Sequence, residues 1–193
     1  MQRFGLRGWR VLAGMALLAL SCGGSETSVA GPTEGGPVGA GETAEQVAAD
    51  DDRMAAPDFE LTDLAGNRVT MAGLRGKTVV IDFWATWCPP CIFQIPILNA
   101  IQAKHGDHGV VVIGVSVDAE GLEVVKPYAE ENGVEYTILL GNEALARKFG
   151  APGFPALAIV APDGKVDSMH VGLIEEAELS AAIEKLQARG DRA

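Results

Sequence analysis

The residues Thr78–Pro96, TVVIDFWATWCPPCIFQIP, contain the signals for a strand, a sharp turn and the start of a helix. The first seven are mostly β-branched or aromatic, which predicts a strand buried on both faces. Pro89 and Pro90 have fixed φ angles and no N–H group, which suits a tight turn leading into a helix. The apolar residues that follow predict a buried helix over about 90–105. Cys88 therefore lies where the strand ends and the helix begins.

Cys88 and Cys91 are separated by two residues, so they can form a disulfide across the first turn of this helix. A helix N-terminus carries a partial charge of about +0.5 and free N–H groups, which favour a thiolate. Cysteines in that position commonly have a lowered pKa, and the thiolate is the attacking species in disulfide exchange. We therefore expect Cys88 to be the nucleophile. Cys91, one turn further along and more buried, is expected to resolve the mixed disulfide.

The motif WCPPC after VIDFWAT resembles the thioredoxin superfamily, and within it the TlpA/ResA-like branch, which is related to the AhpC/TSA redoxins. The resemblance covers about residues 56–186. APDFELTDLAGNRVTMAGLRGK (56–77) resembles that branch's N-terminal hairpin extension, and GFPALAIVAPDGKV (153–166) resembles its cis-proline segment. The resemblance implies an α/β thioredoxin fold with a central mixed sheet flanked by helices. It also implies an N-terminal β-hairpin extension and a central αβ insertion.

The resemblance assigns a substrate-binding surface to the residues around the dithiol. Phe154–Pro155 is expected to be a cis peptide bond, a form that is rare outside X–Pro bonds. The backbone beside Pro155 would pair with an extended segment of the partner protein. Phe154 would contact that segment, and Trp87, Pro89 and Pro90 are expected to complete the surface. The alternative for Trp87 is a role in packing alone.

Two polar residues are expected to control the dithiol. Asp82 is an acid within the apolar strand, six residues before Cys88, and burial would raise its pKa. Thioredoxins carry an aspartate here as proton acceptor for the buried cysteine. Gln94 stands where the anchored branch usually has a glutamate that tunes the dithiol, and glutamine cannot titrate. Our hypothesis is that Asp82 has taken over that role. The alternatives are an Asp82 that faces solvent or is simply hydrogen-bonded, and a Gln94 on the helix surface without function.

The rest of the chain fits one domain without repeats. A second apolar run at 109–117 follows the predicted helix, and a strand–helix–strand unit implies parallel pairing with a right-handed crossover. The remaining predicted elements are helices at 120–132, 143–149 and 175–189 and strands at 59–62, 68–70, 136–140, 155–161 and 165–171.

Residues 1–21 have the features of a signal peptide of the lipoprotein type. Three arginines and no acidic residue precede or flank a short apolar run, Val11–Leu20, which is too short to span a bilayer comfortably. Cys22 would then be the acylated first residue. Ordinary cleavage after Ser21 and an uncleaved anchor are the alternatives. All three place the domain outside the cytoplasm, and the first predicts a lipoprotein that faces the periplasm from the cell envelope.

Composition separates a tether from the folded domain. Residues 22–53 are rich in Gly, Ser, Thr, Pro, Glu and Ala and cannot bury enough apolar surface to fold, whereas 54–193 contain the predicted thioredoxin-like domain. The chain of 193 residues carries a formal net charge of −11, which argues against nucleic-acid binding.

The sequence therefore predicts a membrane-anchored protein-disulfide reductase. Its redox centre would be the Cys88–Cys91 pair, without metal or other cofactor, in a monomer. Partners would be disulfide-containing extracytoplasmic proteins, such as the apocytochromes c or the oxidase- and copper-assembly proteins that the family serves, with a membrane thiol transporter as electron donor. The alternatives are the same fold acting as an oxidant, a thiol peroxidase and a copper chaperone. Thr86 is one position too close to Cys88 for the peroxidase motif. The chaperone would bind copper through Met169 and His170 together with Cys88 and Cys91.

Overall fold

The structure, a computed structural model, describes residues 52–190. The predicted signal peptide 1–21, the lipidation site Cys22 and nearly all of the predicted tether 22–53 lie outside the described residues. These assignments and the domain boundaries therefore remain predictions. Within 52–190, no helix is both long and apolar enough to cross a membrane.

Seven strands form one mixed sheet in the order β2-β1-β5-β4-β3-β6-β7. The pairs β3–β4 and β4–β5 are parallel and the other pairs are antiparallel, which confirms the predicted mixed sheet. The strands are β1 (Glu60–Asp63), β2 (Arg68–Thr70), β3 (Thr78–Trp84), β4 (Val110–Ser116), β5 (Thr137–Leu140), β6 (Ala156–Val160) and β7 (Val166–Val171).

Strand β3 is fully buried and lies between β4 and β6. All seven of its residues are buried, and Ile81 pairs with Ile113 on one side and with Ala158 on the other. A strand covered on both faces needs apolar residues on both faces rather than alternation, which is why β3 is apolar except at Thr78 and Asp82. The dithiol follows the C-terminal end of this strand.

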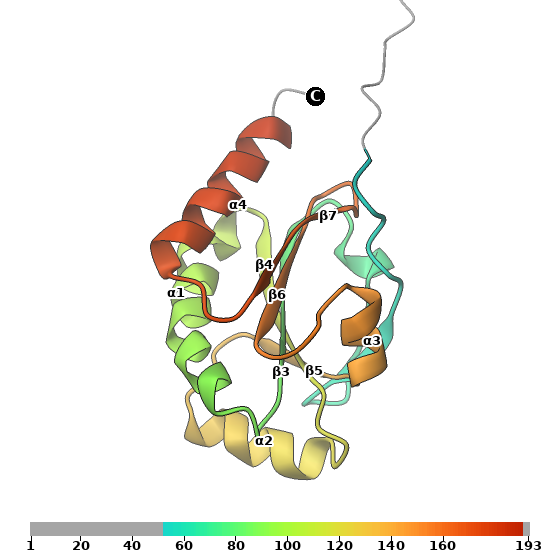
Figure 1. Cartoon of the computed structure of the whole chain (residues 1–193), viewed down its shortest axis with the longest axis vertical. Helices are drawn as coiled ribbons and strands as arrows, with labels where there is room; N and C mark the ends of the chain where they lie inside the picture. The colour runs from blue at the N-terminus through green and yellow to red at the C-terminus, as the bar shows by residue number, and fades with distance from the viewer. Residues whose placement is uncertain (1–51, 191–193) are drawn as a thin grey trace, which may run out of the picture. The chain divides into compact units, whose positions relative to one another are not determined.

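The helices cover both faces of the sheet. They are α1 (Ile95–His105), α2 (Leu122–Glu131), α3 (Glu143–Lys148) and α4 (Glu176–Gly190). The crossovers β3–α1–β4 and β4–α2–β5 step in the same direction, so their right-handedness places α1 and α2 on one face. Helix α4 packs beside α1, and α3 lies on the opposite face (Figure 1). There Phe149 packs against Phe83, with ring centroids 5.3 Å apart.

The helix predicted over about 90–105 is α-helical only in its later part. Residues Pro89–Gln94 form a 3₁₀ helix, and the α-helix begins only at Ile95. Pro96 has no N–H to donate to the Ile92 carbonyl, and its ring would clash with that carbonyl in an α-helix. The N–H of Ile95 instead bonds the Ile92 carbonyl, three residues back.

The predicted hairpin extension and αβ insertion are both present and join each other. Asp63 Oδ1 accepts hydrogen bonds from the N–H groups of Ala65 and Asn67, both at 2.8 Å, and so shapes the β1–β2 turn. Strand β1 then pairs with β5, the strand of the insertion, with Thr62 opposite Leu140. The extension therefore lengthens the sheet.

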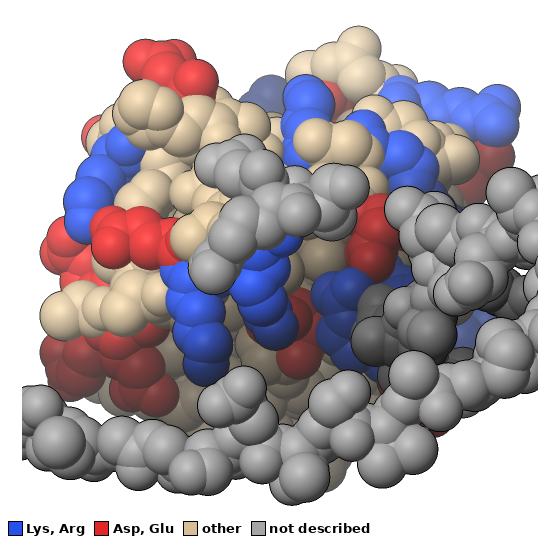
Figure 2. Space-filling model, turned by 90° about the horizontal axis from the view of Figure 1, so that it is seen from above, with Lys and Arg blue, Asp and Glu red and all other residues tan. Residues whose placement is uncertain are grey.

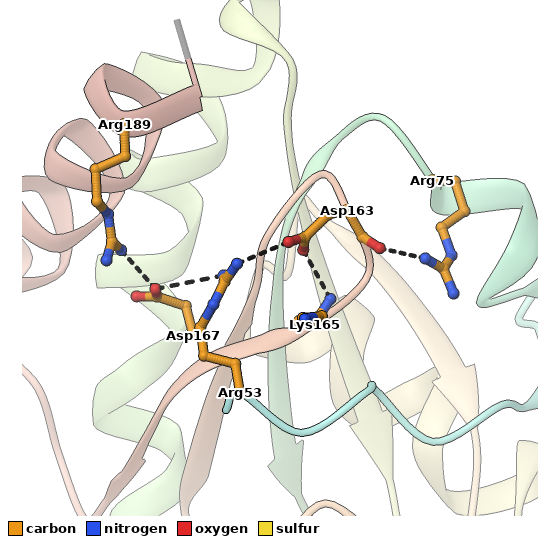
Figure 3. A network of polar contacts seen from close by, with 6 residues as sticks. All are labelled: Arg53, Arg75, Asp163, Lys165, Asp167 and Arg189. Carbon is orange, nitrogen blue, oxygen red and sulfur yellow. Dashed lines mark hydrogen bonds and ion pairs between the residues drawn. The ribbon is translucent and has the colours of Figure 1, made fainter. Parts of the chain in front are cut away.

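A network of ion pairs and hydrogen bonds lies at the end of the sheet opposite the dithiol (Figure 3). Arg53 binds Asp163 at 2.7 Å in the β6–β7 turn, and Arg189 of α4 binds Asp167. Because β6 runs antiparallel to β3, this turn lies beside the start of β3, whereas the dithiol follows its end. Basic and acidic side chains are interspersed on this end of the molecule (Figure 2). The described chain thus starts at the end far from the cysteines.

Candidate active site

Cys88 and Cys91 form a disulfide directly after β3. The Cys88 N–H bonds the Ala85 carbonyl at 3.1 Å, and the Cys91 N–H bonds the Cys88 carbonyl at 3.0 Å. One turn therefore ends at Cys88, and the next connects the two cysteines. Both cysteines are buried, at 4% and 2% exposure. The predicted difference in burial between them is therefore slight in the oxidised state.

The loop before Cys88 is held by a buried acid that the sequence analysis did not identify. Asp118 follows β4 and accepts hydrogen bonds from the Thr86 hydroxyl at 2.6 Å and from the Thr86 N–H at 3.1 and 3.2 Å. Its second oxygen accepts from the Ser116 hydroxyl at 2.8 Å. The strand register explains the contact, because Trp84 pairs with Ser116 and the residues two positions further on, Thr86 and Asp118, are level with each other. The sequence does not show this register, so it carried no signal for Asp118.

Asp82 is buried at 2% exposure, as predicted, and the solvent-facing alternative is wrong. Its desolvation raises its pKa to about 7. Burial, and next the charge of Asp82, raise the pKa of Tyr136, which places the two side chains close together. Asp82 shares a face of β3 with Trp84, whose ring packs on Tyr128 of α2. The carboxyl group therefore lies on the face covered by α1 and α2, where the helix that follows Cys91 packs.

Asp82 Oδ1 and Trp84 Nε1 are the two buried side-chain polar atoms without a hydrogen-bond partner among the described residues. Buried polar atoms are nearly always paired, and exceptions in native structures concentrate where function requires them. An unpaired carboxyl oxygen favours the neutral form, in keeping with the raised pKa of Asp82.

Gly114 gives the rings around Asp82 their space, and Gly114→Ala is expected to destabilise the domain by about 1–3 kcal/mol through overpacking. A Cβ there would lie 2.9 Å from both Trp84 Nε1 and Tyr136 Cε2. Urea unfolding measures the change. Gly153→Ala is the matched control, since its Cβ would meet no atom within 4 Å. Equal stabilities of the two variants would contradict this account.

Gln94 is buried at 1% exposure, so the alternative of a surface residue is wrong. Its Nε2 donates to the Ile174 carbonyl at 3.3 Å, and its Oε1 accepts from the Ile174 N–H at 3.1 Å. A side-chain amide is complementary to a backbone peptide group in this arrangement. Gln94 thereby joins the 3₁₀ helix of the dithiol to the segment between β7 and α4. Its predicted tuning role is not tested by this contact.

The surface around the disulfide is apolar. Trp87 and Phe93 are 56% and 65% exposed, and the Trp87 ring meets Phe154 edge-on with centroids 5.9 Å apart. The Phe154–Pro155 peptide bond is cis, as predicted. Residues 83–103 contain no charged side chain. Exposed patches of this kind mark interaction sites.

The predicted docking residues Pro89 and Pro90 are exposed beside Cys88. A pocket of about 280 Å³ opens between α3 and the loop 151–154, next to Phe154. Arg147 and Pro152 are among the residues that line it. The pocket is large enough for a side chain of a bound polypeptide. The structure thus brings Trp87, Phe154 and the two prolines to one region, although it contains no substrate that would test their roles.

The copper alternative depended on Met169 and His170. The His170 ring bonds the Leu173 carbonyl through Nε2 at 2.9 Å. Within residues 52–190, no group of three or more His, Cys, Asp or Glu side chains is placed to hold a metal ion.

Known proteins are similar to this chain in sequence. The AhpC/TSA family model matches residues 53–169. The thiol-disulfide oxidoreductase ResA from Bacillus thuringiensis (strain Al Hakam) is 28% identical over 132 residues, which are 68% of this chain and 76% of ResA.

Two solved structures are similar in fold and sequence. A thiol:disulfide interchange protein of the thioredoxin family from Chlorobium tepidum TLS has a TM-score of 0.63 and 28% identity, covering 72% of this chain and 99% of that one. The exposed lipoprotein thioredoxin Etrx1 from Streptococcus pneumoniae strain TIGR4 has a TM-score of 0.58 and 26% identity, covering 67% and 100%. Together with the dithiol at the end of β3, these matches show that the chain belongs to the AhpC/TSA family and is a thiol–disulfide oxidoreductase with a thioredoxin fold.

Proposed function

We propose that this oxidoreductase acts as a membrane-anchored reductase of disulfides in extracytoplasmic proteins. The observation that carries the proposal is the Cys88–Cys91 disulfide, which lies at the start of a helix and is surrounded by exposed apolar side chains. A single bridge between residues three apart constrains the unfolded chain very little, so stability does not account for it. Redox exchange accounts for the presence of the disulfide.

The reaction begins from the reduced pair. The Cys88 thiolate attacks one sulfur of the partner's disulfide, the partner's S–S bond breaks, and its other sulfur leaves as a thiolate. Cys91 then loses its proton and attacks the Cys88 sulfur. The bond between Cys88 and the partner breaks, and the partner's second sulfur also leaves as a thiolate. The partner has gained two electrons, and Cys88 and Cys91 are again a disulfide.

Asp82 is the proposed acceptor for the Cys91 proton. It is buried on the sheet face that α1 covers, and its pKa of about 7 lets it exist in both protonation states near neutral pH. A general base acts best when its pKa is close to the working pH. Gln94 cannot take a proton, and its two bonds to Ile174 hold the active-site helix in place instead.

The partner is proposed to bind as an extended segment beside Pro155, with one side chain in the pocket next to Phe154. Extracytoplasmic location is supported by the lipoprotein-type N-terminus and by the similarity to an exposed lipoprotein thioredoxin. Thiols are not maintained there by a cytosolic pool, so a membrane thiol transporter would have to restore the dithiol. Apocytochromes c and copper- or oxidase-assembly proteins are the proposed partners by family resemblance. We propose a monomer without metal or further cofactor.

Replacing the resolving cysteine tests the roles of the two cysteines. Reduced Cys91→Ser protein mixed with insulin is expected to accumulate a mixed disulfide through Cys88, because the second attack cannot occur. Reduced Cys88→Ser protein serves as the control and is expected to accumulate far less. Non-reducing electrophoresis and mass spectrometry identify the adducts. Adducts formed preferentially through Cys91 would reverse the assignment.

The reduction potential decides between reductant and oxidant. Equilibration with dithiothreitol or glutathione buffers, followed through the fluorescence of Trp84 and Trp87, is expected to give a value near that of thioredoxin, about −270 mV. A value near −120 mV would instead indicate an enzyme that introduces disulfides. The absence of any reversible transition would reject the proposed function.

A further inference from the structure

We propose that Asp118 is a positioning residue for disulfide exchange, which it serves by holding Thr86 and thereby orienting Cys88. The inference rests on the proposed function of the dithiol. Asp118 touches neither cysteine in any described contact, so its effect passes through the loop that precedes Cys88.

The contact between Thr86 and Asp118 consists of directed hydrogen bonds on both residues. Thr86 offers its hydroxyl and its N–H to the carboxylate, with the hydroxyl on Oδ1 at 2.6 Å. Ser116 fixes the carboxylate itself, because its hydroxyl donates to Oδ2 at 2.8 Å and accepts from the Asp118 N–H at 3.2 Å. Asp118 is buried at 5% exposure, which shields these bonds from competing water. Side-chain motion at this point is therefore small.

Thr86 is well placed to pass this constraint on to the dithiol. The Cys88 N–H bonds the Ala85 carbonyl, which closes a turn that contains Thr86 and Trp87. Fixing Thr86 therefore fixes the conformation of this turn. Because Cys88 is the last residue of the turn, the orientation of its side chain is fixed as well. The Cys88 sulfur belongs to a buried residue, so a partner disulfide can approach it from few directions. Small errors of orientation then lower the rate strongly.

The chemistry of the cluster requires a carboxylate. The Thr86 N–H, the Thr86 hydroxyl and the Ser116 hydroxyl all donate to the two carboxylate oxygens of Asp118. An asparagine would have one acceptor oxygen, and its NH₂ group would face either the Thr86 or the Ser116 donors. A valine at position 86 would keep the shape and the N–H of threonine but lose the shortest bond.

The test measures how fast the reduced full chain attacks insulin disulfides. Thr86→Val and Asp118→Asn are each expected to lower the rate constant about tenfold, the usual effect of losing one hydrogen bond to a charged group. Thr86→Ser keeps the hydroxyl and is expected to keep the rate within about twofold. Thr137→Val, at an exposed threonine of β5, is the matched control and is expected to change nothing.

Urea unfolding of the oxidised and reduced forms separates positioning from stability. A purely structural role would destabilise both forms equally, leaving the exchange rate and the reduction potential of Thr86→Val at their wild-type values, and that result would overturn the proposal. If Asp118→Asn does not fold, Thr86→Val and Thr86→Ser still decide the question. A wild-type chain that does not reduce insulin would instead refute the proposed function, which distinguishes the two failures.

Discussion

Asp82→Asn is expected to raise the free energy of unfolding at pH 8 by roughly 4 kcal/mol and to leave it nearly unchanged at pH 4. Asp82 is fully buried, and desolvation raises its pKa from 3.8 to about 7. Between these two values the unfolded chain has released this proton and the folded chain still holds it. The contribution of Asp82 to the free energy of unfolding is therefore fully present below about pH 4. It is lost as the pH rises from about 4 to about 7, because the folded chain must then bury a charge.

Urea titrations of the oxidised protein at several pH values measure this effect. Asp107→Asn, at an exposed aspartate near the end of α1, is the matched control and is expected to follow the wild-type profile. The free energy of unfolding of the wild type should fall between pH 4 and pH 7 relative to that of Asp82→Asn. If it does not, the pKa of Asp82 in the folded chain is not raised.

The same substitution is expected to slow the second step of exchange. Without a carboxylate to accept its proton, Cys91 resolves the mixed disulfide more slowly, by roughly 10²-fold, the lower end of the usual effect of general base catalysis. Quenched-flow measurement of the decay of the mixed disulfide tests this. The first attack by Cys88 provides the internal control and should be little affected. An unchanged decay rate at pH 7 would remove Asp82 from the mechanism.

Gln94→Glu is expected to be tolerated at low pH and to destabilise the domain strongly at high pH. A neutral carboxyl group can still donate to the Ile174 carbonyl and accept from its N–H, as the amide does. Once ionised it has no donor, and at 1% exposure it is a buried charge facing a carbonyl oxygen. We expect a loss on the order of 3 kcal/mol between pH 4 and pH 8.

Gln94→Met is the matched control for the loss of both bonds without a charge. It leaves the Ile174 N–H and carbonyl unpaired at every pH, so its destabilisation should be large and independent of pH. Urea unfolding of the two variants across this pH range compares them directly. Parallel pH profiles for Gln94→Glu and wild type would show that the pairing with Ile174 does not discriminate between amide and carboxylate.

Local patterns in the sequence predicted most of the elements and the centre of the site. The continuous apolar run of β3 indicated a strand in the middle of the sheet, and the CxxC spacing indicated a disulfide, because neighbouring residues carry these signals. Burial of Asp82 followed from its place in that run. The 3₁₀ start of the active-site helix was missed, although Pro96 signalled it, because apolar density does not distinguish the two kinds of helix.

Contacts between distant residues were decided by the tertiary structure alone. Thr86 and Asp118 are 32 residues apart, and Gln94 and Ile174 are 80 apart. Apolar periodicity reports which face of an element is buried, but a hydrogen-bond partner depends on strand register and on helix packing, which many residues determine together. The sequence by itself therefore determined the dithiol, the strand that presents it and the buried acid within that strand. Only the folded chain decided which polar groups hold them in position.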